Sequence, residues 1–338
     1  MLWIDVVNEP HVRLWRRFLK RYPQDVLITV RRKGSLIELA RRMLPDHEIH
    51  IVGRWGRSKE DKIRAFAERV RDLVYLLDEY EVDVASSKGS TEQARVAFGL
   101  GIPFIALNDN DLPPHVVTRL TFPLSAVAVV PECFSGPTYG PTVRFRGVFE
   151  VSHVLDYLEE PSREECRRLG LREGSYLVVR PPPVSSHYLE MAEHFEEAIK
   201  RLLDSTGLEE VRFPREGGII LPDGTKLYDV VDGIDLMATS AGVISGGGTM
   251  IREAALLGIP AISLLPREDP CVTRILMEGG LIAKADHRNI VQAYEHLVER
   301  WSTGELRERA RAIISSLEDP VDAIKRALSQ VFNERKLY

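Results

Sequence analysis

The most informative stretch of the sequence is a run of glycines between a short apolar segment and a helical one. Residues 242–245 read Gly-Val-Ile-Ser, glycines occupy positions 246–248, and a helical pattern starts near Thr249. Glycines permit a tight turn and a close approach of the backbone to a ligand. Backbone N–H groups, a helix dipole and the hydroxyls of Ser245 and Thr249 would then meet at the carboxyl end of a strand. This is a phosphate-binding arrangement.

The spacing separates this turn from two common phosphate-binding motifs. No Gly-Lys-Ser/Thr follows, so it is not a P-loop, and it is not the Gly-x-Gly-x-x-Gly of a first strand-to-helix turn. Glu253 lies about one helical turn beyond Thr249, from where its carboxylate could reach a ribose diol. The alternative is a turn that only packs a strand against a helix. We favour ligand binding, because three glycines with a hydroxyl and a carboxylate exceed what packing requires.

Charged residues follow other predicted strands. Arg180 and Arg215 each end a strand in the same half of the chain, where a guanidinium could neutralise a departing diphosphate; the alternative is an ordinary surface position. Asp109 and Asp111 follow a strand of the first half. These carboxylates could orient sugar hydroxyls, act as a general base or bind a divalent ion, or they could serve only the turn.

Short apolar runs alternate with helical periods along the whole chain. Strands separated by helices predict parallel sheets covered on both faces. The predicted strands are 2–7, 26–30, 48–52, 82–85, 104–107, 126–130, 176–179, 211–213, 243–245, 261–264 and 281–283, and the predicted helices include 36–43, 58–80 and 186–203. The pattern loosens near residues 150–161, which predicts a Rossmann-like domain over residues 1–155 and a second over 156–338. Two such domains usually face each other across a cleft that binds ligands, and the last helix could pack on the first domain.

The composition of the chain excludes several classes of protein. The chain has 338 residues, 44% of them hydrophobic, which excludes a disordered chain. Its 45 Lys and Arg against 50 Asp and Glu give no electrostatic case for nucleic acid. No apolar run approaches the ~20 residues of a membrane span, and there is no signal-peptide pattern. The three cysteines and nine histidines do not form a disulfide framework or a metal cluster, so we expect a cytoplasmic protein without a metal site.

Residues 242–266 resemble the nucleotide-sugar signature of GT-B glycosyltransferases and of the related UDP-N-acetylglucosamine 2-epimerases. In both, a glycine-rich turn binds the diphosphate and a helix glutamate binds the ribose. The resemblance implies that Glu253 contacts the ribose and that Arg267, after the next strand, lies where the superfamily commonly contacts the sugar. It implies diphosphate contacts for Ser245, Gly246, Gly247, Gly248 and Thr249.

More closely, the chain resembles an archaeal family of predicted glycosyltransferases formerly described as a domain of unknown function. The matching pieces span nearly the whole chain: Ile4-Asp5, Asn108–Asp111, Gly147–Glu150, Val178–Arg180, Phe213–Arg215 and Gly247–Gly258. The resemblance implies an α/β protein with the GT-B fold, two Rossmann-like domains whose parallel sheets face a central cleft. It also implies an enzyme that moves a sugar from a nucleotide diphosphate donor, most simply UDP-linked, to an acceptor hydroxyl.

GT-B enzymes often carry their general base in the first loop of the N-terminal domain. That place belongs here to His11, which could deprotonate an acceptor near neutral pH, with Glu9 and Asp109 as alternative bases. Backbone amides and a helix dipole can replace a metal, so no cofactor is required beside the donor substrate.

The order of parts in residues 83–109 matches the epimerases, but their acid and base residues are mostly replaced. Lys88-Gly89-Ser90-Thr91 stands at their Gly-Asp-Thr, and Arg180-Pro181-Pro182-Pro183 at their His-Arg-Arg-Glu-Asn. An epimerase is therefore the first alternative, and a catalytically silent nucleotide-sugar-binding protein the second. The sequence leaves open the donor sugar, the stereochemistry, a homodimer, and whether the acceptor is a glycan, a lipid or a small molecule.

Overall fold

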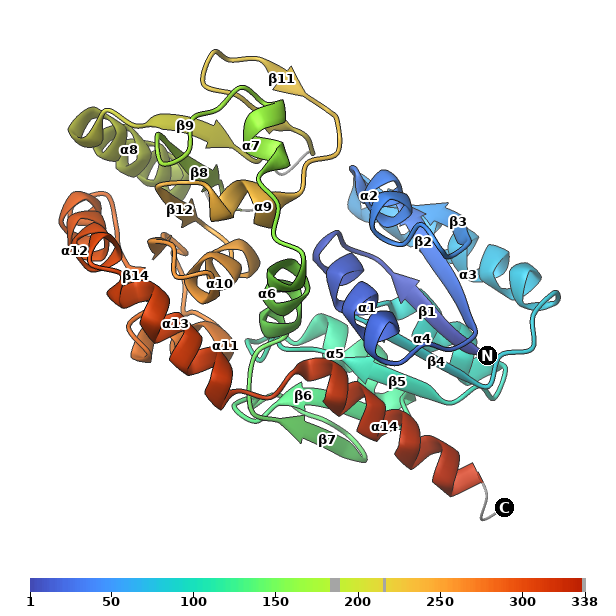
Figure 1. The fold of residues 1–338 in the computed structure, drawn as a ribbon. Helices are drawn as coiled ribbons and strands as arrows, with labels where there is room; N and C mark the ends of the chain where they lie inside the picture. The colour runs from blue at the N-terminus through green and yellow to red at the C-terminus, as the bar shows by residue number, and fades with distance from the viewer. Residues whose placement is uncertain (183–188, 215–216, 336–338) are drawn as a thin grey trace. The chain divides into compact units, whose positions relative to one another are not determined.

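The computed structural model describes residues 1–182, 189–214 and 217–335, and it contains two compact units (Figure 1). Unit 1 comprises Met1–Ser152 and Glu318–Tyr338, and unit 2 comprises His153–Leu317. Each unit has its own seven-stranded sheet with helices packed on it. Unit 1 is therefore built from two segments of the chain that are far apart in sequence.

The sheet of unit 1 has the order β3-β2-β1-β4-β5-β6-β7, and neighbouring strands are parallel. Its strands are β1 (Leu2–Val6), β2 (Val26–Arg32), β3 (Ile49–Arg54), β4 (Val84–Lys88), β5 (Phe104–Leu107), β6 (Val127–Pro131) and β7 (Thr142–Phe145). Its helices are α1 (Pro10–Arg21), α2 (Leu36–Met43), α3 (Lys59–Leu77), α4 (Thr91–Gly99), α5 (Val116–Thr121), η1 (Phe122–Leu124) and α14 (Pro320–Arg335). The chain leaves β1 toward β2 and leaves β4 toward β5, so the strand order reverses between β1 and β4. Such a switch point is where open parallel sheets bind ligands.

The sheet of unit 2 has the order β11-β10-β9-β8-β12-β13-β14, and its order reverses between β8 and β12. Its strands are β8 (Tyr176–Arg180), β9 (Glu209–Arg212), β10 (Ile219–Ile220), β11 (Lys226–Leu227), β12 (Gly242–Ser245), β13 (Ala261–Ser263) and β14 (Ile282–Lys284). Its helices are α7 (Glu164–Arg168), α8 (Leu189–Thr206), α9 (Gly233–Ala238), α10 (Thr249–Leu256), α11 (Cys271–Glu278), α12 (Ile290–Ser302) and α13 (Glu305–Ser316), and α6 (Glu150–Glu159) crosses the boundary between the units. β9, β10 and β11 pair antiparallel at the edge, and the other strands pair parallel.

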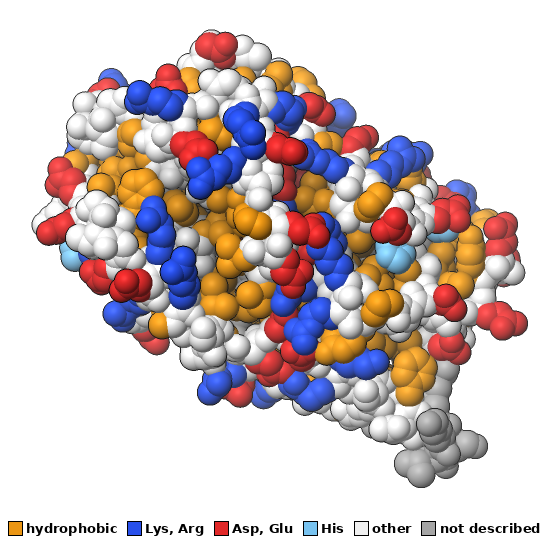
Figure 2. Space-filling view, viewed as in Figure 1, with side chains coloured by type: hydrophobic (Ala, Val, Ile, Leu, Met, Phe, Trp, Pro, Cys, Tyr) orange, Lys and Arg blue, Asp and Glu red, His pale blue; other side chains and the backbone are white. Residues whose placement is uncertain are grey.

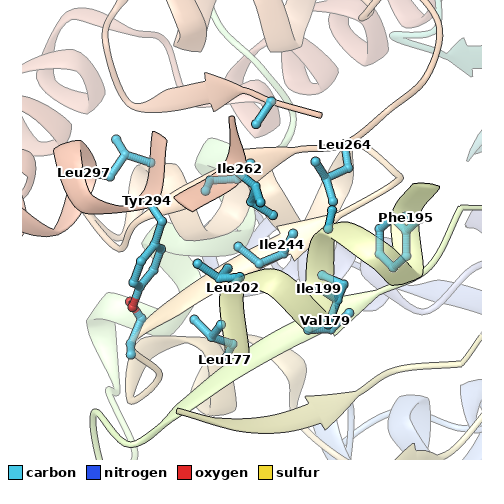
Figure 3. Close-up of a cluster of buried hydrophobic side chains, with 14 of the residues drawn as sticks. Leu177, Val179, Phe195, Ile199, Leu202, Ile244, Ile262, Leu264, Tyr294 and Leu297 are labelled. Atoms are coloured by element: carbon cyan, nitrogen blue, oxygen red, sulfur yellow. The ribbon is translucent and has the colours of Figure 1, made fainter. Parts of the chain in front are cut away.

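Apolar side chains from α8 and α12 cover one face of the sheet in unit 2 (Figure 3). Leu177 and Val179 from β8 and Ile244 from β12 are fully buried in this cluster. A fully buried side chain of this kind contributes about 1.5–3 kcal/mol. The short, continuous apolar strands of the sequence are explained by this burial, since parallel strands are covered on both faces.

The core of unit 1 contains a buried ion pair. The carboxylate of Asp5 on β1 accepts two hydrogen bonds from Arg69 on α3, at 2.9 and 2.6 Å, and both side chains are fully buried. Thr29 on β2 also donates to Asp5 at 2.7 Å, and the indole N–H of Trp3 donates to Thr29 at 2.9 Å. Burial opposes the charged form of Asp5, but the charge of Arg69 and these hydrogen bonds outweigh it, so the pKa of Asp5 lies below its ordinary value of 3.8.

Several local predictions need correction. β7, α5 and α6 were not predicted, because their patterns are short or interrupted by loop residues. The turn ahead of α12 is held by Asp286, whose carboxylate accepts from the N–H groups of Arg288 and Asn289 and whose carbonyl accepts from the N–H of Ile290. The first residues of the helix predicted over 186–203 lie outside the described residues. Of the helices that the structure describes, none is long and apolar enough to span a membrane.

Candidate functional site

The glycine turn lies at the switch point of unit 2. The N–H of Gly246 donates to the carbonyl of Arg180 at 2.9 Å, which joins the end of β12 to the end of β8. The N–H of Leu264 donates to the carbonyl of Ser245 at 2.9 Å, which extends the same edge to β13. The start of α10 is thus held at the carboxyl edge of the sheet, as the sequence predicted.

The turn is shaped by close packing. The hydroxyl of Ser245 is fully buried and accepts from the N–H of Gly247 at 2.9 Å. A Cβ at Gly246 would lie 2.7 Å from the backbone nitrogen of Pro182, and one at Gly248 would lie 2.3 Å from Nη1 of Arg252. None of the three glycines in the turn has a positive φ in the described structure. Packing alone therefore requires glycine at position 246, whereas a side chain at position 248 would have to displace the guanidinium of Arg252.

Within the described chain, the N-terminal end of α10, which is the positive end of its helix dipole, has no capping side chain and no acidic residue in its first turn. Gly248 is the cap residue. The guanidinium of Arg252 is buried beneath the turn, where Nη1 donates to Thr273 at 3.0 Å. Nη1 of Arg180 lies 4.0 Å from the sulfur of Met250 in the same first turn. Backbone amides and two cations therefore gather where a phosphate group could bind.

Glu253 is buried one turn into α10 and has a partner that the sequence did not reveal. Its Oε1 lies 2.8 Å from Nδ1 of His153 on α6, and the imidazole must donate because a carboxylate only accepts. Both side chains are nearly inaccessible to solvent. In the described part of the chain, Nε2 of His153 has no hydrogen-bond partner. His153 therefore fixes one carboxylate oxygen of Glu253.

Two other arginines, Arg267 and Arg215, were expected to contact the donor. Arg267 is exposed in the loop after β13, and its carbonyl accepts from Nζ of Lys284 at 3.1 Å. Lys284 also donates to the carbonyl of Leu265 and to the carboxylate of Asp269, so it ties this loop to the end of β14. Arg215 lies outside the described residues.

A cavity of about 460 Å³ opens at the ends of β13 and β14. Its wall includes the rings of His194 and His287, which stack with their centres 4.4 Å apart. The other lining residues are Phe195, Leu264, Leu265, Pro266, Lys284, Ala285, Asp286, Arg288 and Asn289. The volume is that of a small-molecule pocket, and it continues the edge formed by the glycine turn.

The candidate bases of unit 1 follow β1 and β5. His11 is the second residue of α1 and is 7% exposed. Glu9 accepts from both the N–H and the hydroxyl of Ser35, at 3.2 and 2.8 Å, and so holds the start of α2. Glu9 therefore has a structural task, whereas His11 lies beside it at the carboxyl end of β1.

Asp109 is paired with Lys88, the last residue of β4. Nζ of Lys88, at the end of β4, lies 2.9 Å from the carboxylate of Asp109, and both side chains are mostly buried. The amide of Asn108 shapes the turn by accepting from the N–H groups of Asp109 and Asn110. The turn chemistry is therefore confirmed, and the same segment places a carboxylate at the carboxyl edge of the sheet. The role of Asp109 toward a ligand stays a prediction. In the described ranges, no three His, Cys, Asp or Glu side chains gather as a metal site.

Two buried residues of the site in unit 2, His153 and Arg252, were not identifiable from the sequence. His153 is 100 positions from its partner, and no spacing rule connects them. Arg252 follows the glycine turn, but only the structure shows that its guanidinium packs under Gly248.

The chain is similar to a family of proteins along almost its whole length. The family model described as "Protein of unknown function (DUF354)" matches residues 1–333. The chain belongs to the DUF354 family. An uncharacterized protein of Methanocaldococcus jannaschii is 30% identical, and the match covers 95% of each chain.

Solved structures share the fold of this DUF354 protein. The UDP-GlcNAc 2-epimerase of Methanocaldococcus jannaschii, in complex with UDP-GlcNAc and UDP, has a TM-score of 0.67 at 14% identity and covers 93% of this chain and 99% of its own. The UDP-GlcNAc 2-epimerase of Neisseria meningitidis has the same TM-score and identity and covers 98% and 100%. The spinosyn forosaminyltransferase SpnP has a TM-score of 0.61 at 14% identity and covers 98% of both chains. At these identities the likeness shows the fold, which is of the GT-B kind.

Proposed function

We propose that this DUF354 protein is a cytoplasmic glycosyltransferase that moves a sugar from a UDP-linked donor to an acceptor hydroxyl. One observation carries the proposal: the uncapped start of α10 lies at the switch point of unit 2, with Arg180 beside it and Glu253 one turn further on. The fold is shared with proteins named as UDP-GlcNAc epimerases and as a sugar transferase, which supports a nucleotide-sugar ligand.

The donor would bind with its diphosphate at residues 245–249 and its ribose at Glu253. His153 holds one oxygen of Glu253, so the other oxygen is oriented for a diol. As the bond to the sugar breaks, negative charge grows on the diphosphate, and the amides of α10 with Arg180 stabilise it. Arg267 and the cavity after β13 lie where the sugar would extend. This scheme requires no metal or other cofactor.

The acceptor would be activated in unit 1. His11 is the base that we propose, because it follows β1 at the carboxyl edge of the sheet, whereas Glu9 holds the start of α2 through Ser35. An imidazole suits removal of a hydroxyl proton near neutral pH. Asp109 is the second choice, since its ion pair could open when a substrate binds.

An epimerase is the second candidate, favoured by the many 2-epimerases that share the fold. The two reactions separate cleanly in one experiment. The protein is first screened for thermal stabilisation by a panel of UDP-sugars, and the best donor is then incubated with and without an acceptor library and followed by mass spectrometry. A new glycoside with release of UDP supports the transferase. Conversion of the donor alone identifies an epimerase, and stabilisation without any turnover identifies a binding protein.

A further inference from the structure

An exposed tryptophan in unit 1 is surrounded by cations. Trp55 follows β3 and is 42% exposed. The guanidinium carbon of Arg31 lies 4.3 Å from the centre of its rings, and the amines of Lys33 and Lys62 each lie 5.0 Å from it. We call these four residues the Trp55 cluster. Cation–aromatic contacts hold the three positive charges close together in spite of their mutual repulsion.

Nearby acidic side chains are already engaged by other groups. Asp61 lies 2.9 Å from Nη1 of Arg54 and also accepts from the N–H of Arg57. Glu9 binds Ser35, and Glu92, 3.5 Å from Arg31, is shared with Arg69 at 3.9 Å. Within the described residues Lys62 makes no ion pair. Lys62 therefore retains a positive charge that an anion could neutralise.

The location of the cluster also indicates a ligand. Arg31 and Lys33 lie at the end of β2, Trp55 at the end of β3, and Lys62 in the first turns of α3. Lys33 donates to the side chain of Asn8, which follows β1. The cluster thus lies at the carboxyl edge of three adjacent strands, the edge that also carries His11, and parallel sheets bind ligands at this edge.

We propose that the Trp55 cluster binds a phosphate group of the acceptor. Lys33 and Lys62 would donate charge-assisted hydrogen bonds to the phosphate, while the indole supports the part of the acceptor attached to it. The naming of the ligand as acceptor rests on the proposed transferase function, but phosphate binding does not. The phosphate can belong to a soluble sugar phosphate or to a lipid headgroup.

Binding is measured without a donor, so that it does not depend on catalysis. The probes are glucose 6-phosphate, with glucose as the neutral control, and vesicles containing phosphatidic acid, with phosphatidylcholine vesicles as control. Binding is followed by tryptophan fluorescence. Trp3 and Trp15 are buried and Trp301 belongs to unit 2, so a change on binding comes from Trp55 if Trp55→Phe abolishes it. We expect one phosphate-bearing probe to bind and the Lys33→Met/Lys62→Met variant to bind it at least about tenfold more weakly. The control variant Lys200→Met/Lys226→Met removes two exposed lysines of unit 2 and should bind like the wild type.

The outcomes separate this inference from the proposed function. Binding of glucose 6-phosphate that the variant loses supports a soluble acceptor, and binding only to phosphatidic acid supports a lipid. If neither probe binds, or if the lysine variant binds as well as the control variant, the cluster is not a phosphate site. Phosphate binding that depends on both lysines, in a protein that transfers no sugar, would overturn the transferase and leave the site in place.

Discussion

At the switch point of unit 2, the groups presented to a ligand are mainly backbone: the turn of Gly246–Gly248 and the first amides of α10, with one carboxylate fixed by His153. At the switch point of unit 1, they are side chains held by other side chains. Lys88 pairs with Asp109 there, and in the core of the same unit Asp5 pairs with Arg69. Two sheets with the same reversal of strand order thus carry different kinds of groups at their carboxyl edges.

The two units should therefore be sensitive to different kinds of mutation. A backbone site depends on shape, so an added methyl group damages it while a lost surface charge does not. A site of paired side chains depends on charge, so an isosteric replacement damages it. Mutations that change shape and mutations that change charge should therefore have different effects in the two units.

The largest effect should come from His11→Ala. We expect sugar transfer to fall by about 10²–10⁴, as for loss of a general base, while UDP affinity is unchanged because His11 and the nucleotide site belong to different units. Rates of transfer and calorimetric titration with UDP test this. His47→Ala serves as the control, and equal turnover in both variants would move the role of base to Asp109.

The next largest should come from Asp5→Asn. This change leaves the buried Arg69 with only the more distant Glu92, at 3.9 Å, as a counter-ion, and should lower the free energy of unfolding by about 3–5 kcal/mol in denaturant titrations. Asp72→Asn removes the partner of Arg71 on the surface of α3 and should cost less than about 1 kcal/mol.

The Asp5 contribution should also depend on pH. Because its folded pKa is lowered, the unfolded chain binds the proton more tightly, and the contribution is present above about pH 3.8 and lost as the pH falls through the lowered value. The difference between the wild type and Asp5→Asn should therefore shrink in acid. A difference that is constant with pH would contradict an ionised Asp5.

In unit 2, Gly246→Ala should weaken UDP binding about ten- to a hundredfold. A Cβ there would lie 2.7 Å from the backbone of Pro182, so the turn must shift, and such overpacking typically costs about 1–3 kcal/mol. Calorimetry with UDP is the measurement, with thermal unfolding to verify the fold. Gly140→Ala is the matched control, because a Cβ at Gly140 meets no described atom within 4 Å. Wild-type affinity in Gly246→Ala would show that the shape of the turn is not what binds UDP.

The smallest effect concerns the pair of Glu253 and His153. Glu253→Ala should weaken UDP binding about tenfold or more through lost hydrogen bonds to the ribose, and His153→Ala should weaken it less. The double variant should be no worse than Glu253→Ala, because His153 acts only through the carboxylate. His296→Ala is the control, because His296 is exposed on α12 and does not line the cavity. Additive losses would mean that His153 contacts the ligand itself.

Elements with a strong hydrophobic period could be predicted from the sequence. Contacts between distant segments of the chain could not. β5 and α2 have the predicted bounds, since an apolar run or an amphipathic period with clear ends defines each of them. The glycine turn was predicted to start a helix at the end of a strand, and it does. β7, which is only half buried, was not predicted, because its residues lack a continuous apolar run.

The site was predictable as a motif but not as a set of contacts. Glu253 could be singled out from its distance to the turn, whereas His153 could not, because the pair depends on where α6 packs. The same holds for Trp55, whose three cations come from two separate segments of the chain. Tertiary packing determines such clusters, and a single sequence does not record it.

The position of α14 has a consequence for how the protein is made. Asp319, just before this helix, accepts from Arg17 at 2.5 Å and from Ser152 at 3.0 Å, so it joins the two segments of unit 1. A ribosome produces Arg17 and Ser152 long before it reaches Asp319, and all of unit 2 emerges in between. Because domains tend to fold as they emerge, unit 2 can complete its fold while unit 1 still waits for its last helix. The nascent chain thus finishes its second unit first.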